Sequence, residues 1–288
     1  ALPASGIWPG TLTLSTNTST SAKIVIQVYL AVSPATGVPF GAFETPAGGT
    51  AVLASSVPVT GWALDDVGVK KVQIWREPVG REGVYPNGLV YIGDAIFVPD
   101  ARPDVASLFG DKPNNYRAGW GYLMLTNFLP NPTGGPSGNG TYKIHAIAVD
   151  EEGKQTELGV KTITVNNAKA TKPFGTIDAP WPGEVVSGAS YGVTGWALTP
   201  QPYKVDESGK GIWIAIDGVW LANASYNSYR SDIATLFPSY ANANGSAADY
   251  SLDTTKLSNG MHSIAWVVTD VAGRVDGLGS RFFFVRNA

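Results

Sequence analysis

The sequence has no cysteine, and only two methionines and two histidines occur among its 288 residues. The missing cysteines exclude disulfide bonds, thiolate catalysis and cysteine-ligated zinc, so the burial of apolar surface has to stabilise the fold. Charged residues make up 15% of the chain, and the net charge is -3. Such a weak charge gives no electrostatic reason to expect nucleic acid or an anionic membrane as a partner.

Long apolar runs are missing as well. No stretch reaches the roughly 20 apolar residues that a membrane helix needs, so we expect no membrane insertion. The first residues, Ala1 to Ala4, contain neither an initiator methionine nor a signal-peptide pattern. We interpret the chain as a processed or excised piece of a longer protein.

Residues that favour strands and turns are abundant. The chain has 34 glycines and 20 prolines between short runs rich in Val, Ile, Thr, Tyr and Trp. This composition is typical of many short strands separated by turns, and no helix of useful length is predicted. The sequence therefore predicts an all-β protein.

Two long segments of the chain repeat each other. Val59-Thr-Gly-Trp-Ala-Leu64 recurs as Val193-Thr-Gly-Trp-Ala-Leu198, and the Arg-x-Asp segment from Arg102 to Phe109 recurs from Arg230 to Phe237. The distance between the copies shortens along the chain, as expected if surface loops differ in length between shared strands. We predict three units: residues 1–36, 37–169 and 170–288.

Each copy is predicted to be an antiparallel immunoglobulin-like sandwich, because its short strands follow one another at turn-separated intervals. Asp217-Gly218 predicts a type I′ hairpin, and the tryptophan of each Gly-Trp-Ala-Leu motif is expected in the core. The predicted strands are 58–64, 71–75, 89–98, 120–127, 142–149 and 159–165 in the first copy, and 191–198, 212–216, 219–224, 248–252, 262–269 and 280–285 in the second.

The first 36 residues belong to neither copy. They predict a β-hairpin with strands at 10–14 and 22–32, and the second strand is apolar on both faces. Two strands alone bury too little surface to offset the entropy lost on ordering them, so a partner has to cover this hairpin. The alternate residues expected to form an inter-subunit strand are Ile24, Ile26, Val28, Leu30 and Val32.

A family resemblance rests on several of these segments. Residues 6–15 followed by 22–34 resemble the last two strands of a bacterial Ig-like domain of the BACON type. Residues 38–288 resemble paired Ig-like modules near the C-termini of long secreted bacterial surface proteins. The phrases that carry this resemblance include Gly61-Trp-Ala-Leu-Asp-Asp66, Arg102-Pro-Asp-Val105, Arg117-Ala-Gly-Trp120 and Gly279-Ser-Arg-Phe282. The resemblance implies an extracellular, non-catalytic module.

The uncovered hairpin leaves three arrangements open. It can pack on its own chain, form a dimer, or complete a sheet in a neighbouring subunit, and the last arrangement repeated head to tail builds filaments. We favour a structural subunit that polymerises by strand or hairpin exchange. The alternative is a carbohydrate- or protein-binding accessory module of a secreted enzyme or adhesin. Its candidate exposed aromatic residues are Trp213, Trp220, Tyr226 and Tyr229.

Residues suited to catalysis are few, and we predict no enzyme. His145 and His262 do not occupy equivalent positions in the two copies, and each lies within a predicted strand. The Gly188-Ala-Ser-Tyr-Gly192 match to a nucleophile elbow is followed by a strand, whereas that motif requires a helix. No catalytic residue and no resident cofactor is predicted.

Calcium is the only metal that the sequence brings into consideration. Loop carboxylates bind calcium in many secreted domains, and the candidates here are Asp65, Asp66, Asp150 and Asp270. The Asp-x-x-Gly spacing at Asp150 and Asp270 is equally typical of a β-turn with aspartate in its first position, which we favour. In the Arg-x-Asp segments, Asp104 and Asp232 are expected to cap a short helix, and the preceding arginine to pair with that aspartate or with a loop carbonyl.

Overall fold

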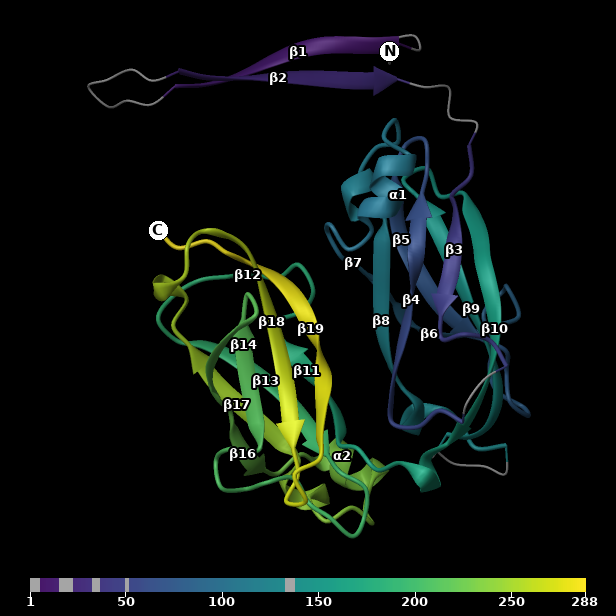
Figure 1. Cartoon of the computed structure of the whole chain (residues 1–288), viewed down its shortest axis with the longest axis vertical. Helices are drawn as coiled ribbons and strands as arrows, with labels where there is room; N and C mark the ends of the chain where they lie inside the picture. The colour runs from purple at the N-terminus through teal and green to yellow at the C-terminus, as the bar shows by residue number, and fades with distance from the viewer. Residues whose placement is uncertain (1–5, 16–22, 33–36, 50–51, 133–137) are drawn as a thin grey trace.

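The computed structural model describes residues 6–15, 23–32, 37–49, 52–132 and 138–288. Its sheets confirm the predicted fold class: an N-terminal hairpin precedes two antiparallel β-sandwiches (Figure 1). None of the helices in these residues is long and apolar enough to span a membrane.

The first sandwich consists of two four-stranded sheets. One has the order β3-β4-β8-β7 and the other β10-β9-β5-β6. The predicted strand 89–98 is in fact two strands that belong to different sheets, because the chain crosses from one sheet to the other at Ala95. The elements are β3 (Phe40–Thr45), β4 (Ser56–Leu64), β5 (Val69–Arg76), β6 (Val90–Asp94), β7 (Ile96–Phe97), α1 (Pro103–Leu108), η1 (Asn115–Arg117), β8 (Gly119–Leu125), η2 (Thr126–Phe128), β9 (Asn139–Asp150) and β10 (Gln155–Asn166).

The second sandwich repeats this topology. Its sheets have the orders β11-β13-β17-β16 and β12-β19-β18-β14-β15. η3 (Asn167–Lys169) ends the first unit. The elements of the second sandwich are β11 (Phe174–Ala179), β12 (Val185–Val186), β13 (Tyr191–Leu198), β14 (Ile212–Ile216), β15 (Val219–Asn223), β16 (Ser225–Ser228), α2 (Ser231–Leu236), η4 (Ala243–Gly245), β17 (Ala247–Leu252), η5 (Thr254–Lys256), β18 (Gly260–Thr269) and β19 (Val275–Val285).

Details of the pairing also recur in both sandwiches. The short strand β12 pairs in parallel with β19, and a parallel bridge from Leu53 to Val165 takes its place in the first sandwich. Asp217 and Gly218 have φ angles of 51° and 76°, which confirms the predicted type I′ turn between β14 and β15. The first strand of each sandwich, β3 or β11, was missing from the predicted list.

A tryptophan and an alanine occupy reversed positions in the cores of the two sandwiches. In the first core Trp120 on β8 is buried beside Ala146 on β9, and in the second core Ala248 on β17 is buried with Trp266 on β18. These positions correspond, because Trp120 and Ala248 pair with the equivalent glycines Gly61 and Gly195. One indole thus fills each core, but it comes from opposite sheets in the two copies.

The glycine of the Gly-Trp motif is required by this packing. A Cβ on Gly61 would lie 2.5 Å from the Trp120 ring, and one on Gly195 would lie 2.7 Å from the Trp266 ring. Any larger side chain would displace the core indole.

Trp196 is buried and Trp62 is partly buried, as expected of core residues, but both lie outside the main core of their sandwich. Side chains alternate along a strand, so the residues on either side of each tryptophan point into the sandwich and the tryptophan points outward. There the short helix covers it: Trp62 stacks on Phe109 at 5.6 Å, and Trp196 stacks on Phe237 at 6.1 Å. Each sandwich therefore has a second, smaller core under α1 or α2.

The N-terminal hairpin forms a two-stranded sheet of its own. β1 (Gly6–Ser15) and β2 (Lys23–Val32) pair in continuous register from Gly6 opposite Val32 to Ser15 opposite Lys23. Figure 1 shows both strands apart from the sandwiches. Val28 is 46% exposed, whereas the side chains of Ile24, Ile26, Leu30 and Val32 lie outside the described part of the structure.

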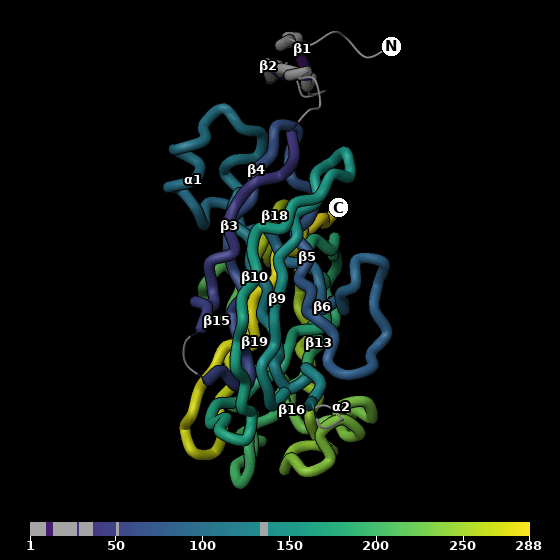
Figure 2. The backbone as a smooth tube through the Cα atoms, turned by 90° about the vertical axis from the view of Figure 1, so that its right-hand side faces the viewer, coloured from purple at the N-terminus to yellow at the C-terminus, as the bar shows by residue number. Residues whose placement is uncertain are grey.

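The two sandwiches lie side by side rather than end to end (Figures 1 and 2). Phe128 of the first sandwich packs edge-on against Trp196 and Phe237 at 6.0 and 5.5 Å. Leu125 packs against the same aromatic cluster. The second small core is therefore completed by residues of the first sandwich, which ties the two units together.

The tryptophan exchange predicts coupled mutations. Trp120→Ala is expected to destabilise the first sandwich by about 3–5 kcal/mol because it leaves a cavity. Ala146→Trp alone is expected to cost about 1–3 kcal/mol because it overfills the core. The double variant copies the second sandwich, so it is expected to recover most of the loss. Chemical unfolding of all four proteins gives the coupling energy, and strictly additive losses would contradict the exchange.

Candidate functional site

An exposed aromatic face lies on the second sandwich. Along β14 the isoleucines Ile212, Ile214 and Ile216 are buried, while Trp213 is 50% exposed. Trp220 on β15 is 62% exposed and belongs to the same face, because it stands opposite Ala215, two residues from Trp213. Two indoles thus lie on neighbouring strands of one sheet surface.

Tyr226 is not part of this face, and the prediction that it is exposed is wrong. It lies on β16, which belongs to the opposite sheet, and it packs against the main core. Its hydroxyl donates to the Ala197 carbonyl at 2.8 Å, and burial raises its pKa. Tyr229, just beyond the end of β16, is exposed.

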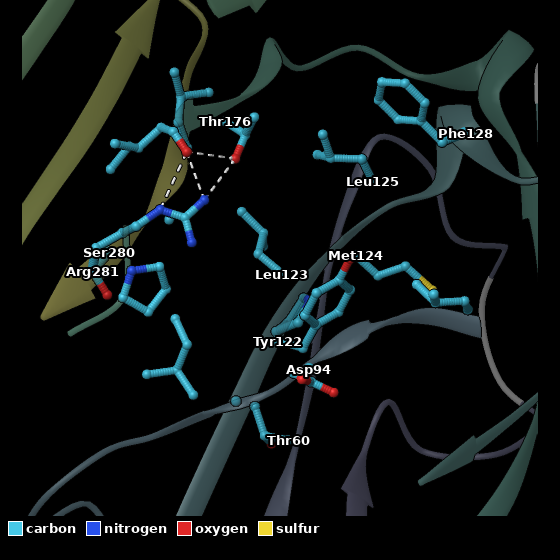
Figure 3. A pocket seen from close by; sticks show the side chains of 18 of the residues that line it. Thr60, Asp94, Tyr122, Leu123, Met124, Leu125, Phe128, Thr176, Ser280 and Arg281 are labelled. Carbon is cyan, nitrogen blue, oxygen red and sulfur yellow. Dashed lines mark hydrogen bonds between the residues drawn. The ribbon is translucent and has the colours of Figure 1, made fainter. Parts of the chain in front are cut away.

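A cleft of about 660 Å³ runs between the two sandwiches (Figure 3). Its lining comes from β6 and β8 on one side and from β11 and β19 on the other. Arg281 of β19 donates from Nη2 to the Ile177 carbonyl at 2.6 Å and to the Thr176 hydroxyl at 3.3 Å. Burial lowers the pKa of Arg281, against the opposing attraction of Asp178.

The lining of this cleft is mainly apolar. Its lining contains Leu123, Met124 and Leu278 beside the polar groups of Tyr122, and Asp94 is the single carboxylate among the lining residues. General acid–base catalysis needs a positioned proton donor and acceptor, commonly a histidine or two carboxylates. Neither occurs among the residues that line the cleft.

His262 forms an arrangement that outwardly resembles a catalytic triad. Its Nδ1 lies 2.6 Å from an Asp217 carboxylate oxygen, and Ser258 Oγ lies 3.4 Å from its Nε2. Nε2, however, lies closer to the Ser258 carbonyl, at 2.8 Å. Burial lowers the pKa of His262, but the Asp217 and Ser258 acceptors outweigh it and raise the pKa overall. Both ring nitrogens face acceptors, so the protonated ring can donate from both, and the contact with Asp217 ties the β14–β15 turn to β18.

The other catalytic candidates also have structural partners. His145 Nδ1 lies 2.7 Å from Glu157 on the adjacent strand β10. Ser190, the serine of the nucleophile-elbow match, shares a hydrogen bond of 2.8 Å with Ser251 across the sheet, and β13 follows it directly. A strand in this place lacks the helix that the nucleophile-elbow geometry requires.

Asp270 is fully engaged within its turn. Its Oδ1 accepts from the backbone N–H groups of Ala272 and Arg274, at 2.9 and 3.0 Å. Its Oδ2 accepts from Arg274 Nε at 2.7 Å and from the Thr199 hydroxyl at 2.9 Å. The residue therefore has the turn role that its spacing predicts.

The equivalent site in the first sandwich has a different charge balance. Asp150 Oδ1 accepts from the N–H groups of Glu152 and Lys154, both at 2.8 Å, and Asp65 replaces Thr199. Burial raises the pKa of Asp65, and the nearby Asp66 and Asp150 raise it further, against the Val67 N–H that lowers it. Within the described ranges, no group of three or more His, Asp or Glu residues is placed to hold a metal ion. The four calcium candidates thus do not form a ligand set here.

The Arg-x-Asp segments form the same ion-pair network in both sandwiches. Arg102 donates to both Asp104 carboxylate oxygens and, at 2.7 Å, to Glu44 on β3. Arg230 pairs in the same way with Asp232 and with Asp178 on β11. The expected helix cap is wrong, because the arginine occupies the cap position and the aspartate lies in the first turn. The network attaches the helix to the first strand of its sandwich.

No family model matches this sequence, and no curated protein matches it. Among solved structures, the chain is similar to fibronectin(III)-like modules of Clostridium thermocellum CbhA, with 15% identity over 86% of this chain and 95% of that chain, at a TM-score of 0.27. A chain from the complex of Dpr2 Ig1–Ig2 with DIP-Theta Ig1–Ig3 has 12% identity over 87% of this chain and 100% of that chain, with a TM-score of 0.26.

An adhesin stabilised by Ca²⁺, with which an Antarctic bacterium binds ice, has 13% identity over 98% of this chain and 57% of that chain, with a TM-score of 0.21. TM-scores of this size do not define a shared fold. The assignment as tandem immunoglobulin-like sandwiches therefore rests on the chain's own sheets.

The contrast between Asp65 and Thr199 predicts a stabilising substitution. Because the folded state raises the pKa of Asp65, its contribution to stability is most favourable below the ordinary aspartate pKa and is lost as the pH rises through the folded-state value. Asp65→Thr supplies the hydroxyl donor that the second sandwich uses. It is expected to raise the unfolding free energy by about 1–3 kcal/mol at neutral pH and by less near pH 4.

Thermal unfolding at both pH values measures this effect. The reciprocal Thr199→Asp variant is the matched control, and it is expected to destabilise the second sandwich at neutral pH. An Asp65→Thr effect of the same size at both pH values would contradict the role given to the buried carboxylate.

Proposed function

We propose that this protein is a non-catalytic, extracellular structural subunit, which joins its neighbours in a surface filament or adhesive assembly by exchange of the N-terminal hairpin. One observation carries the proposal: β1 and β2 pair only with each other in the described part of the chain. A two-stranded sheet is marginally stable in water unless a further surface covers it.

The pairing register supports an inter-subunit role for this hairpin. Opposite residues on antiparallel strands share a face, so Gly10 pairs with Val28 and Leu12 pairs with Ile26 on the same face. Every position that shares this face is apolar or glycine, and Leu12 and Val28 are both exposed. Covering such a face in a neighbouring subunit removes apolar surface from water and stabilises the assembly.

Hairpin exchange of this kind is directional. The donor segment and its acceptor are different surfaces of the same chain, which makes the contact heterologous. Heterologous contacts build open filaments unless the rotation between subunits closes a ring. The resemblance of residues 6–34 to the end of a BACON-type domain agrees with a segment suited to complete a sandwich. In this proposal residues 1–36 are the donor unit, and residues 37–169 and 170–288 are the two sandwiches.

A second function is favoured by a separate observation, the exposed indoles of Trp213 and Trp220 together with Tyr229. Exposed aromatic rings bind sugar rings by stacking, so the rival proposal is a carbohydrate- or protein-binding accessory module. Glycan arrays with the native chain and with Trp213→Ala/Trp220→Ala test it directly. A monomer that binds a polysaccharide and loses that binding in the double variant would favour this rival.

The filament proposal predicts that assembly depends on the hairpin. The native protein is expected to form high-mass species by light scattering and filaments in negative-stain electron microscopy. Both are expected to disappear when residues 1–34 are removed. Val28→Glu should have the same effect, because it places a charge within the apolar face.

Thr11→Glu is the matched control, because it introduces the same carboxylate one register position away, on the opposite face of the hairpin and on β1. It is expected to leave assembly nearly unchanged. Monodisperse monomers in the native sample would overturn the proposal, and equal loss of assembly in both point variants would show that the apolar face is not the contact.

A further inference from the structure

The two sandwiches differ in how one sheet face is covered. In the first sandwich, residues 77–89 connect β5 to β6 and fold back over the sheet. Tyr85 of this connection packs edge-on against Trp75 at 5.2 Å, and Trp75 is only 8% exposed. Arg76 anchors the connection through paired hydrogen bonds of 2.5 and 2.6 Å to Glu82. In the first sandwich the connection 77–89 thus covers the sheet face around Trp75.

The second sandwich has no such cover. The two-residue turn Asp217-Gly218 replaces the long connection between its strands β14 and β15. Trp220 stands opposite Ala215, just as Tyr91 stands opposite Trp75 in the first sandwich. Without a covering segment, Trp213 and Trp220 are 50% and 62% exposed, whereas Trp75 under the connection in the first sandwich is 8% exposed.

Strand β15 is also an open sheet edge. It ends the strand order of its sheet, and β14 is its single partner among the described strands. Val219 is 70% exposed although it stands opposite the buried Ile216. Proteins usually protect such an edge with charged residues or proline, and β15 has neither in its sequence Val-Trp-Leu-Ala-Asn.

We propose that β15 is the acceptor edge for the N-terminal hairpin of a second copy of this chain, with the hairpin covering Trp220 and Val219. This inference rests on the proposed function and adds the acceptor surface to which the donor hairpin binds. The chemistry of the two strands matches: β15 is exposed and apolar on both faces at Val219 and Trp220, and β2 is mainly apolar on both faces. Added strands are bound through backbone hydrogen bonds, which both open edges can supply.

The charges of the two surfaces agree with this occupant. Lys23 is the only charged residue in the first 36 positions of the sequence, and it lies at the end of β2. β15 has no charged side chain. Pairing these strands therefore buries no unpaired charge in the middle of the contact, which would otherwise cost several kcal/mol.

Charge substitution at the edge tests the acceptor. Val219→Lys is expected to weaken association about tenfold or more in sedimentation experiments, because it places a charge in the contact. Val271→Lys is the matched control: it makes the same change at an exposed valine of the same sandwich, in the turn between β18 and β19. Thermal unfolding of both variants checks that each one folds.

Crosslinking gives a second, independent readout, because the natural chain has no cysteine. Differently tagged Val28→Cys and Val219→Cys chains are mixed and oxidised. A disulfide-linked heterodimer is expected from this pair and not from Val28→Cys mixed with Val271→Cys.

The outcomes separate the two proposals. If the native chain assembles while Val219→Lys assembles equally well and the crosslink is absent, β15 is not the acceptor and the hairpin proposal stands. If the native chain stays monomeric, both proposals fail.

Discussion

The fold of each sandwich depends on one dipeptide, the Gly-Trp of β4 and β13. Because neighbouring residues on a strand face opposite sides, the glycine admits an indole into the main core while the tryptophan holds the short helix on the outer face. The two cores of each sandwich are thereby coupled through a single strand. The same coupling extends between the sandwiches, since Phe128 of the first completes the aromatic cluster around Trp196 of the second. Packing of the outer cluster therefore also sets the side-by-side arrangement.

Duplication left the two copies with the same framework and different surfaces. The arginine network that attaches each helix is retained in both sandwiches, and so is the turn built on Asp150 or Asp270. The differences are local. Asp65 in the first copy stands where the second has Thr199, the core tryptophan lies on opposite sheets in the two copies, and only the first copy has the connection 77–89. The copy without the cover exposes Trp213, Trp220 and the edge of β15. These differences, rather than the shared framework, distinguish the surfaces on which binding and assembly are proposed.

Much of the fold was predictable from the sequence because repeats, turn residues and strand periodicity are local signals. The type I′ turn at Asp217-Gly218 and the buried isoleucine face of β14 follow directly from short patterns. The strand error at 89–98 arose because two short apolar runs, separated by Gly93 and Asp94, belong to different sheets, and the chain crosses between them at Ala95. The position of Trp62 was missed for a related reason: alternation defines two faces, but a short helix far along the chain decides that the outer face is also covered. Tyr226 was missed because β16 belongs to the opposite sheet.

The sequence by itself determined the duplication, the all-β class, the alternation of each strand and the excess of apolar residues in β2. Only the tertiary structure decided which surfaces meet. The nearness of Asp65 to Asp150, the packing of Phe128 on Trp196, the engagement of both His262 nitrogens and the open edge of β15 all join residues distant in sequence. The local sequence pattern determines which face of each strand is apolar. Which other element packs on that face depends on the strand connections and loop lengths of the whole molecule.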